Sequence, residues 1–240
     1  NLIIINNKIS KGANFCRNQG IKKSTNEINF LLDDDDYLLT NSFESRLVGF
    51  TDKDVGISYT GIKIVSTNDL TRYLRTVIPK TKISQFDLIK RGNLIGSTSR
   101  VALRKSFFLK VGGFDEKLCC LQDYDLWIRM SSVCDVYSDN LSTVVYTIHE
   151  SNKQVSTNYK KYLEASKYLI DKYRKLYTSL NISKEFKSNL YLRISLSASS
   201  SSFKIKTTYS FLSFHYKPNI KALIVCTCPF FILRNFFHFV

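Results

Sequence analysis

Four consecutive aspartates, Asp33 to Asp36, follow an apolar segment and are the residues best suited to chemistry. Carboxylates this close repel one another unless a cation neutralises them. Asp33 and Asp35 alternate after a predicted strand, so both can face one divalent ion. Mg²⁺ and Mn²⁺ suit such a site because they keep phosphate oxygens and waters among their ligands. A solvated acidic turn that merely ends the strand is an equally good interpretation of the run taken alone.

A second acidic feature is Asp123, in the segment 122–129 (QDYDLWIR). The segment predicts an aromatic-rich helix with Asp123 near its start, where the helix dipole favours an ionised carboxylate. A carboxylate held there can accept a proton from a hydroxyl nucleophile. A simple helix N-cap is the alternative, because Asp is a common capping residue.

The elements that must position these residues alternate between apolar runs and polar helical stretches from Asn1 to about Tyr146. Strands are predicted at 2–5, 28–32, 56–59, 62–65 and 133–137, and helices at 14–22, 41–48, 104–111 and 124–131. The alternation is typical of an α/β domain in which helices cover a mostly parallel sheet. Ligands of such sheets bind beyond the carboxyl ends of the strands.

The second part of the chain is basic and ends in apolar residues. The net charge is +15, with 35 Lys and Arg against 20 Asp and Glu, and the basic residues concentrate in 159–175 and 184–221. Residues 156–176 predict a basic amphipathic helix. Residues 220–240 are apolar but interrupted by Pro229, which favours an interfacial segment over a span. A helix packed on the preceding domain is the alternative. The basic stretches lack a nucleic-acid docking module, so we expect a membrane surface and no nucleic acid as the polyanionic partner.

Four ordered segments resemble motifs of the family 2 inverting glycosyltransferases, which have the GT-A fold. Residues 12–21 (GANFCRNQGI) resemble the family's G-x-x-x-A-R-N-x-G-I helix, and residues 30–36 (FLLDDDD) its F-L-D-x-D-D metal motif. Residues 112–116 (GGFDE) and 122–129 resemble G-G-F-D-E followed by E-D-Y-D-L-W-x-R. The shared order of four segments makes the resemblance specific over about two thirds of the chain.

The resemblance implies a donor site around the acidic run. Asp33 is expected to contact the ribose or diphosphate of the donor, and Asp35 to ligate Mn²⁺ or Mg²⁺. Asp34 and Asp36 flank them as donor-binding residues. Arg17 matches a residue close to the nucleotide pocket, with a salt bridge on the helix surface as the alternative.

The resemblance also implies a base and a further metal ligand. Asp123 matches the general base that deprotonates the acceptor hydroxyl, while the metal stabilises the leaving diphosphate. His149 resembles the His of an H-x-x-N-x-x-S tail near the metal or diphosphate, and a surface His in a loop is the alternative. Gln122 stands where the family usually has Glu, but Asp123 is retained. Trp127 and Phe114 are expected in the core.

The family implies inverting transfer of a sugar from a nucleoside-diphosphate donor, a UDP-sugar first of all, to a saccharide or lipid-linked acceptor in glycan biosynthesis. Its opening strand and D-G-S-x-D loop would precede Asn1, so we expect an N-terminally truncated domain with an incomplete nucleotide pocket. A truncated or degenerate module that binds a nucleotide sugar without turnover is the alternative.

Two regions are therefore predicted: a GT-A domain over 1–156, and a helical, basic, membrane-associated region over 157–240. The six cysteines have no regular spacing, which indicates a reduced compartment. We expect a cytoplasmic protein held peripherally at the inner face of the membrane.

Overall fold

The structure is a computed structural model that describes residues 2–148, 158–230 and 233. The chain divides into two compact units. Unit 1 comprises Asn1–Gln85 and Ser97–Ile148, and unit 2 comprises Phe86–Gly96 and the residues from His149 onward. All residues of the predicted acidic site that the structure describes lie in unit 1.

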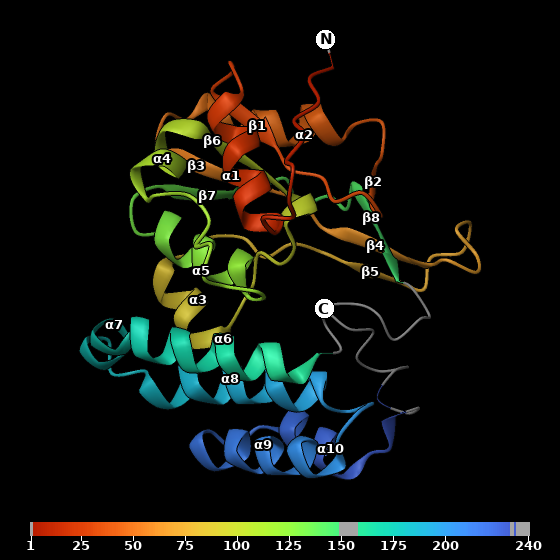
Figure 1. Ribbon diagram of the computed structural model, residues 1–240, viewed down its shortest axis with the longest axis vertical. Coiled ribbons are helices and arrows are strands. Elements are labelled where there is room, and N and C mark those ends of the chain that lie inside the picture. Colours follow the sequence, from red (N-terminus) through yellow and green to blue (C-terminus); the bar gives the residue numbers. More distant parts are fainter. Residues whose placement is uncertain (1, 149–157, 231–232, 234–240) are drawn as a thin grey trace. The chain divides into compact units, whose positions relative to one another are not determined.

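Unit 1 contains two four-stranded sheets (Figure 1). The first has the strand order β1-β6-β3-β7 and the second β2-β8-β4-β5. The bounds of the strands are β1 (Ile28–Phe30), β2 (Tyr37–Leu38), β3 (Val55–Tyr59), β4 (Ile62–Ser66), β5 (Arg75–Val77), β6 (Val101–Arg104), β7 (Asp135–Ser138) and β8 (Val144–Ile148).

Strand pairing in both sheets is mixed. β3 pairs with β7 and β4 with β8 in parallel, whereas β1 with β6, β3 with β6, β2 with β8 and β4 with β5 are antiparallel. The predicted α/β class with helices flanking sheets is confirmed. The expectation of mostly parallel pairing is not met among the described strands, because the order of apolar runs along a chain does not determine which strand edges meet.

The helices of unit 1 match the predicted ones closely. They are α1 (Ala13–Lys23), α2 (Ser42–Leu47), α4 (Lys105–Lys110) and α5 (Gln122–Met130), with short 3₁₀ turns η1 (Val48–Thr51) and η2 (Thr98–Arg100). Trp127 is fully buried and Phe114 is 2% exposed, so both lie in the core as expected. Phe108 of α4 meets Phe114 edge to face, with ring centroids 5.8 Å apart. This contact packs α4 against the G-G-F-D-E segment.

The strand predicted at residues 2–5 is wrong. The described residues there form no strand, and Leu2, Ile3 and Ile4 are 72–89% exposed. An apolar run becomes a strand only when a neighbouring strand supplies hydrogen-bond partners, and none of the described strands pairs with this segment.

Unit 2 is helical. It contains most of α3 (Gln85–Arg91), together with α6 (Tyr159–Lys172), α7 (Arg174–Ser179), α8 (Ser183–Ser197), α9 (Phe203–Tyr216) and α10 (Ile220–Thr227). The described part of the predicted amphipathic helix is confirmed, with a break at Tyr173 between α6 and α7. Residues 195–202, which are rich in serine, form the end of α8 and the turn into α9.

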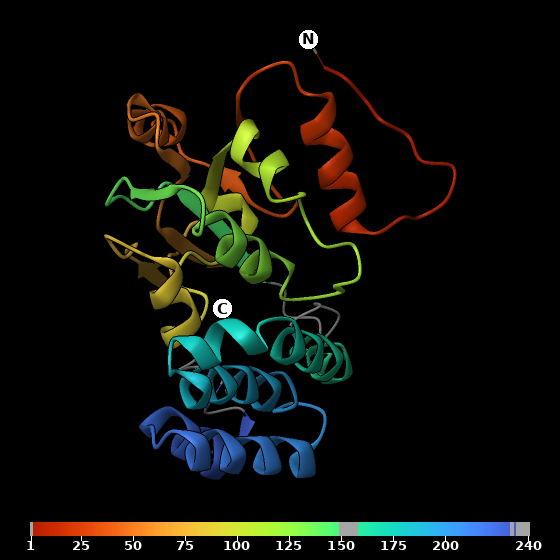
Figure 2. The ribbon, with the colours of Figure 1, turned by 90° about the vertical axis from the view of Figure 1, so that its left-hand side faces the viewer.

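Helices α8 and α9 pack along each other, as the two ribbon views show (Figures 1 and 2). Serine pairs bridge them: Ser188 Oγ lies 3.0 Å from Ser213 Oγ, and Ser195 Oγ lies 2.8 Å from Ser210 Oγ. Small side chains let the helix backbones approach closely, and each buried hydroxyl gains a partner. The pairs therefore set the register of the two helices.

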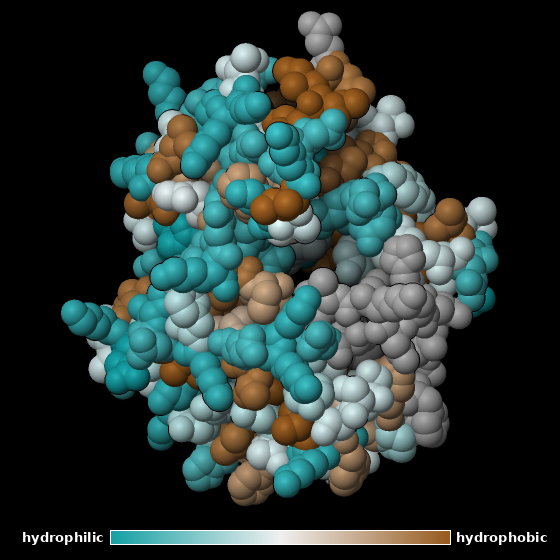
Figure 3. All heavy atoms as spheres, in the orientation of Figure 1, coloured by the Kyte–Doolittle hydropathy of each residue, from teal (hydrophilic) through white to brown (hydrophobic). Residues whose placement is uncertain are grey.

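The last described helices expose apolar side chains. Phe203 and Phe211 of α9 and Ile220 of α10 are 65–74% exposed, and hydrophobic residues alternate with hydrophilic ones on the visible face of these helices (Figure 3). Among the described residues, no helix combines the length and the hydropathy that crossing a bilayer requires.

Candidate active site

The acidic run begins directly after β1. Leu31 N donates to Val101 O at 3.1 Å, which extends the pairing with β6, and Asp36 N donates to Asp33 O at 3.2 Å, which closes a turn. Asp34 and Asp35 are exposed, Asp33 is half-buried and Asp36 is 8% exposed. The run is therefore not a uniformly solvated turn, because one of its four carboxylates lies inside the protein.

Asp33 is held by residues from two distant segments. Its Oδ1 accepts from Arg17 Nη2 at 2.5 Å, and its Oδ2 accepts from Thr98 Oγ1 at 3.0 Å. Its backbone amide donates to Ser99 Oγ at 3.0 Å. Because both carboxylate oxygens already have partners, Asp33 orients Arg17 and the 98–99 turn in this structure.

Arg17 bridges the first two motifs and is not a surface salt bridge of α1. Its guanidinium also lies 5.7 Å from the centroid of the Phe114 ring. Its second terminal nitrogen, Nη1, is buried and has no hydrogen-bond partner among residues 2–148, 158–230 and 233. A buried cationic donor without an acceptor is costly, so this atom is suited to an anionic or carbonyl oxygen of a ligand.

Asp36 is the buried carboxylate of the run. Its Oδ1 accepts from Thr147 N of β8 at 3.3 Å. Burial, helped by the charges of Asp35 and Asp33, raises the pKa of Asp36 to about 6, and hydrogen bonding from Ser99 and Thr147 limits the rise. Its Oδ2 has no hydrogen-bond partner within the described part of the chain. A cation beside this carboxylate would remove most of the cost of ionising it.

Asp123 lies in the first turn of α5, one residue after the helix begins. The capping residue is Leu121, so the interpretation of Asp123 as a simple N-cap is not supported. Asp123 Oδ1 accepts from the adjacent Tyr124 N at 2.8 Å. Leu121 has φ 57° and ψ 17°, a left-handed conformation that costs a non-glycine residue about 1–2 kcal/mol. The chain thus enters α5 through a strained residue next to the predicted base.

The hydroxyl of Tyr146 in β8 is affected by the charges of both Asp123 and the acidic run. Burial, and then the negative charges of Asp36, Asp35, Asp33 and Asp123, raise the pKa of its hydroxyl to about 12. The four carboxylates therefore lie within electrostatic range of one phenol, although Asp123 is separated from the run by most of unit 1 in sequence. Tyr146 was not among the residues predicted for the site, because no motif marks it.

The motif helix α1 is attached to the G-G-F-D-E segment by two buried amides. Asn18 Nδ2 donates to Phe114 O at 3.0 Å, and Phe114 N donates to Asn18 Oδ1 at 2.8 Å. Asn14 Nδ2 donates to Asp115 O and Leu118 O, each at 2.8 Å. Gly113 has φ +74°, and a Cβ there would lie 2.7 Å from Asn18 Oδ1. The two motifs therefore form one structural cluster, which accounts for the glycine.

Two buried charged residues support the site and were missed from the sequence. Asp125 is fully buried and accepts from Arg129 Nε at 2.9 Å and Nη2 at 2.6 Å. Arg46, also fully buried, donates to Ser99 O at 3.3 Å, on the turn that holds Asp33. Burial lowers the pKa of Arg46 to about 10. The i, i+4 spacing of Asp125 and Arg129 is a signal that could have been used, whereas nothing in the sequence marks Arg46.

The donor set fits a metal shared with a ligand better than a metal held by protein alone. No group of three or more His, Cys, Asp or Glu that could hold an ion occurs among the described residues, and the predicted ligand His149 lies outside them. Mg²⁺ and Mn²⁺ bind through one or two carboxylates when phosphates and waters complete the shell. The exposed Asp35 and the buried, underbonded Asp36 meet that requirement.

The sequence relatives of this chain are named as glycosyltransferases. An uncharacterized glycosyltransferase of Haemophilus influenzae is 29% identical over 175 residues, covering 72% of this chain and 59% of the relative. One of Rickettsia typhi is 30% identical over 152 residues, covering 60% of this chain and 46% of the relative. The chain thus spans about half the length of these curated relatives.

Among solved structures, S. aureus TarS 1-349 in complex with UDP-GlcNAc is 13% identical, with a TM-score of 0.46 over 90% of this chain and 71% of that one. The sequence model described as "Glycosyltransferase like family 2" matches residues 4–193. This match takes in both acidic features and all four motifs, and the chain therefore belongs to glycosyltransferase-like family 2.

Proposed function

We propose that the protein transfers a sugar, with inversion, from a nucleoside-diphosphate donor to a saccharide or lipid-linked acceptor. The observation that carries the proposal is a set of buried, unsatisfied polar atoms, three of them on the motif segments and one on Ser97, just before η2. Arg17 Nη1, Asp36 Oδ2, Ser97 Oγ and Gln122 Oε1 have no hydrogen-bond partner within the described residues. Each such atom costs about 1–3 kcal/mol, so a polar ligand that satisfies them would bind favourably.

Each part of the proposed site has a role in that reaction. Arg17 and Ser97 can donate to the diphosphate or to the nucleoside, and Asp123 accepts the proton of the acceptor hydroxyl. Asp35 and Asp36 would hold Mn²⁺ or Mg²⁺, which supplies stabilisation of the charge that develops on the leaving diphosphate. Asp33 positions Arg17. A UDP-sugar is the first donor to test.

The test is release of nucleoside diphosphate from a panel of UDP-, GDP- and dTDP-sugars in the presence of Mn²⁺, with and without saccharide acceptors. We expect Asp123→Asn to lower the rate by roughly 10²- to 10⁴-fold, which is the usual contribution of a general base. Asp35→Asn should raise the Mn²⁺ concentration needed for half-maximal rate. Asp54→Asn is the control, an exposed carboxylate of unit 1 that lies outside the four motifs. If Asp123→Asn and Asp35→Asn both behave as the control does, the assignment is refuted.

A second candidate is a module that binds a nucleotide sugar without turnover. Gln122 in the place of the family's usual Glu favours it, since the base then lacks a neighbouring carboxylate. Calorimetry with UDP and Mn²⁺ discriminates the two: binding that Arg17→Met weakens, together with no release from any donor, supports the module. Attachment of the 157–240 region to the cytoplasmic face of a membrane stays a prediction, as does the absence of nucleic-acid partners.

A further inference from the structure

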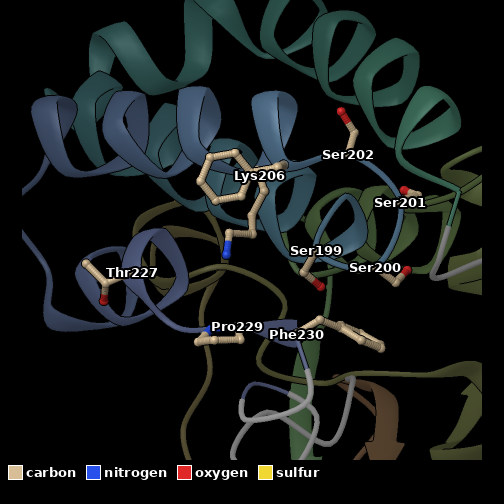
Figure 4. Close-up of a pocket in the computed structure, with 9 residues that line it drawn as sticks. Ser199, Ser200, Ser201, Ser202, Lys206, Thr227, Pro229 and Phe230 are labelled. Carbon is tan, nitrogen blue, oxygen red and sulfur yellow. The ribbon is translucent and has the colours of Figure 1, made fainter.

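Unit 2 contains a cavity whose lining residues include none of the acidic residues of unit 1. It has a volume of about 460 Å³ and lies among the turn after α8, the first turn of α9 and the end of α10 (Figure 4). Serine residues 199–202, Lys206 and Thr227 give it a polar lining, and Phe203 and Pro229 add apolar surface. The volume exceeds that of several water molecules, so the cavity can admit a small ligand.

Lys206 brings a positive charge to this cavity. The residue is 3% exposed, and its Nζ donates to Cys228 O at 2.8 Å. Its amino group points into the space between Ser199, Thr227 and Pro229 (Figure 4). Among the residues that the structure describes, no carboxylate forms an ion pair with it. An ammonium group has three N–H donors, and one carbonyl oxygen neither uses them all nor neutralises the charge.

The start of α9 lies at the same cavity. Ser202 caps this 14-residue helix, since its Oγ accepts from Ile205 N at 3.4 Å. The first amides of a helix have no acceptors within the helix, and its dipole places partial positive charge there. The exposed residues Ser200 and Ser201 add hydroxyl donors on the neighbouring turn. The start of α9, the serine hydroxyls and the buried ammonium of Lys206 together supply hydrogen-bond donors and positive charge. Among the described residues, no carboxylate forms an ion pair with this ammonium.

We propose that this cavity binds a phosphate group. A phosphate group is opposite in charge to Lys206 and can accept hydrogen bonds from it, from the serine hydroxyls and from the first turn of α9 at once. The group can come from a soluble phosphate or from the headgroup of a phosphomonoester lipid, whose apolar part would meet Phe203, which is 74% exposed. This site does not depend on the proposed transferase reaction, because all its residues lie in unit 2.

The experiment uses the whole chain and two probes: inorganic phosphate, followed by calorimetry, and phosphatidylcholine vesicles that contain phosphatidic acid, followed by sedimentation. Vesicles with phosphatidylglycerol at matched surface charge control for general attraction to anionic membranes. Lys206→Gln removes the charge but retains a donor for Cys228 O. Lys204→Gln, at an exposed position of the same helix, makes the same change in net charge and is the matched control.

We expect Lys206→Gln to weaken binding of the phosphate group by about 10- to 100-fold, the usual effect of losing a charged hydrogen-bond partner, and Lys204→Gln by less than about twofold. If the loss occurs with inorganic phosphate, a soluble phosphate is the ligand. If the loss occurs only with phosphatidic acid and not with phosphatidylglycerol, the ligand is a lipid headgroup. Equal effects of the two lysine variants on both probes would overturn the proposal.

A second variant covers the case in which Lys206→Gln does not fold. Ser200→Asp places a negative charge at an exposed position of the cavity lining and leaves Lys206 in place. It should weaken binding of the same probe by about tenfold, because a like charge near the phosphate opposes it. Wild-type affinity of a folded Ser200→Asp variant for both probes would equally overturn the proposal.

Discussion

The stability of an Asp36→Asn variant relative to the wild type, both without ligand, should be greater at neutral pH than at acidic pH. Asp36 is 8% exposed, and burial raises its pKa from 3.8 to about 6. Asn has the same shape, and its Oδ1 can still accept from Thr147 N, so the substitution removes the buried charge while it retains this hydrogen bond.

The sign follows from proton binding. Between pH 3.8 and about pH 6 the folded wild type keeps the Asp36 proton after the unfolded chain has lost it, so its free energy of unfolding falls as the pH rises. The pKa of Asp36 differs by about two units between the folded and the unfolded state. This difference lowers the free energy of unfolding of the wild type by about 3 kcal/mol at pH values where Asp36 is ionised in both states. About 2 kcal/mol of this change falls between about pH 4.5 and about pH 8. An unpaired Asn amide costs the same at every pH, so it cancels from the comparison of the two pH values.

The assay is urea unfolding of wild type, Asp36→Asn and the control Asp34→Asn at several pH values, without metal or nucleotide. The stability of Asp36→Asn relative to wild type should rise by about 2 kcal/mol across this range. The exposed control should stay within about 0.5 kcal/mol of wild type. A relative stability of Asp36→Asn that does not change with pH would refute the inference that Asp36 is buried and hard to ionise.

Three further substitutions test how the motifs are joined, and urea unfolding measures each of them. Gly113→Ala should cost at least about 1 kcal/mol more than Gly112→Ala, because both glycines have positive φ but only a Cβ at Gly113 would collide with Asn18 Oδ1; equal costs would contradict the contact. Asn18→Ala should cost about 2–3 kcal/mol, since it leaves the amide and carbonyl of Phe114 unpaired, and a cost below about 0.5 kcal/mol would exclude that role. Arg129→Met should cost about 3–5 kcal/mol, because it leaves the fully buried Asp125 without its ion pair. Adding Asp125→Leu to this variant should recover part of the lost stability. If the double variant recovers none of it, an unpaired buried charge is not the cause of the loss.

Much of the fold was predictable because periodicity and burial agree in its longer elements. The helices α1, α4 and α5 and the strands β3 and β4 lie close to where the sequence placed them. Strands β2 and β5 have only two or three residues, too few for an alternating pattern to appear. Strand β8 has five residues, mostly β-branched, and was missed although its composition is typical of a strand.

The predicted site depends on the fold in a way that spacing alone cannot reveal. Asp33 and Arg17 belong to separate motifs that a family pattern can identify. The turn that completes their environment, Thr98 and Ser99, comes about 65 residues later and carries no motif. Tyr146 reaches the carboxylates because β8 pairs with β2 just after the acidic turn. These partners are set by strand pairing between distant segments.

The hydrogen bonds of Asp33 indicate that the four aspartates have different roles. An acidic run suggests four equivalent ligands for a cation, yet both oxygens of Asp33 have partners, and one of them is a guanidinium at 2.5 Å. A carboxylate neutralised by Arg17 gains less from a metal than Asp36, whose pKa burial raises to about 6 and whose Oδ2 lacks a partner among the described residues. The proposed Mn²⁺ or Mg²⁺, if bound, would therefore lie toward the Asp35 and Asp36 side of the turn. Arg17, fixed by Asp33 and with Nη1 unsatisfied, then remains to bind the anionic part of the ligand.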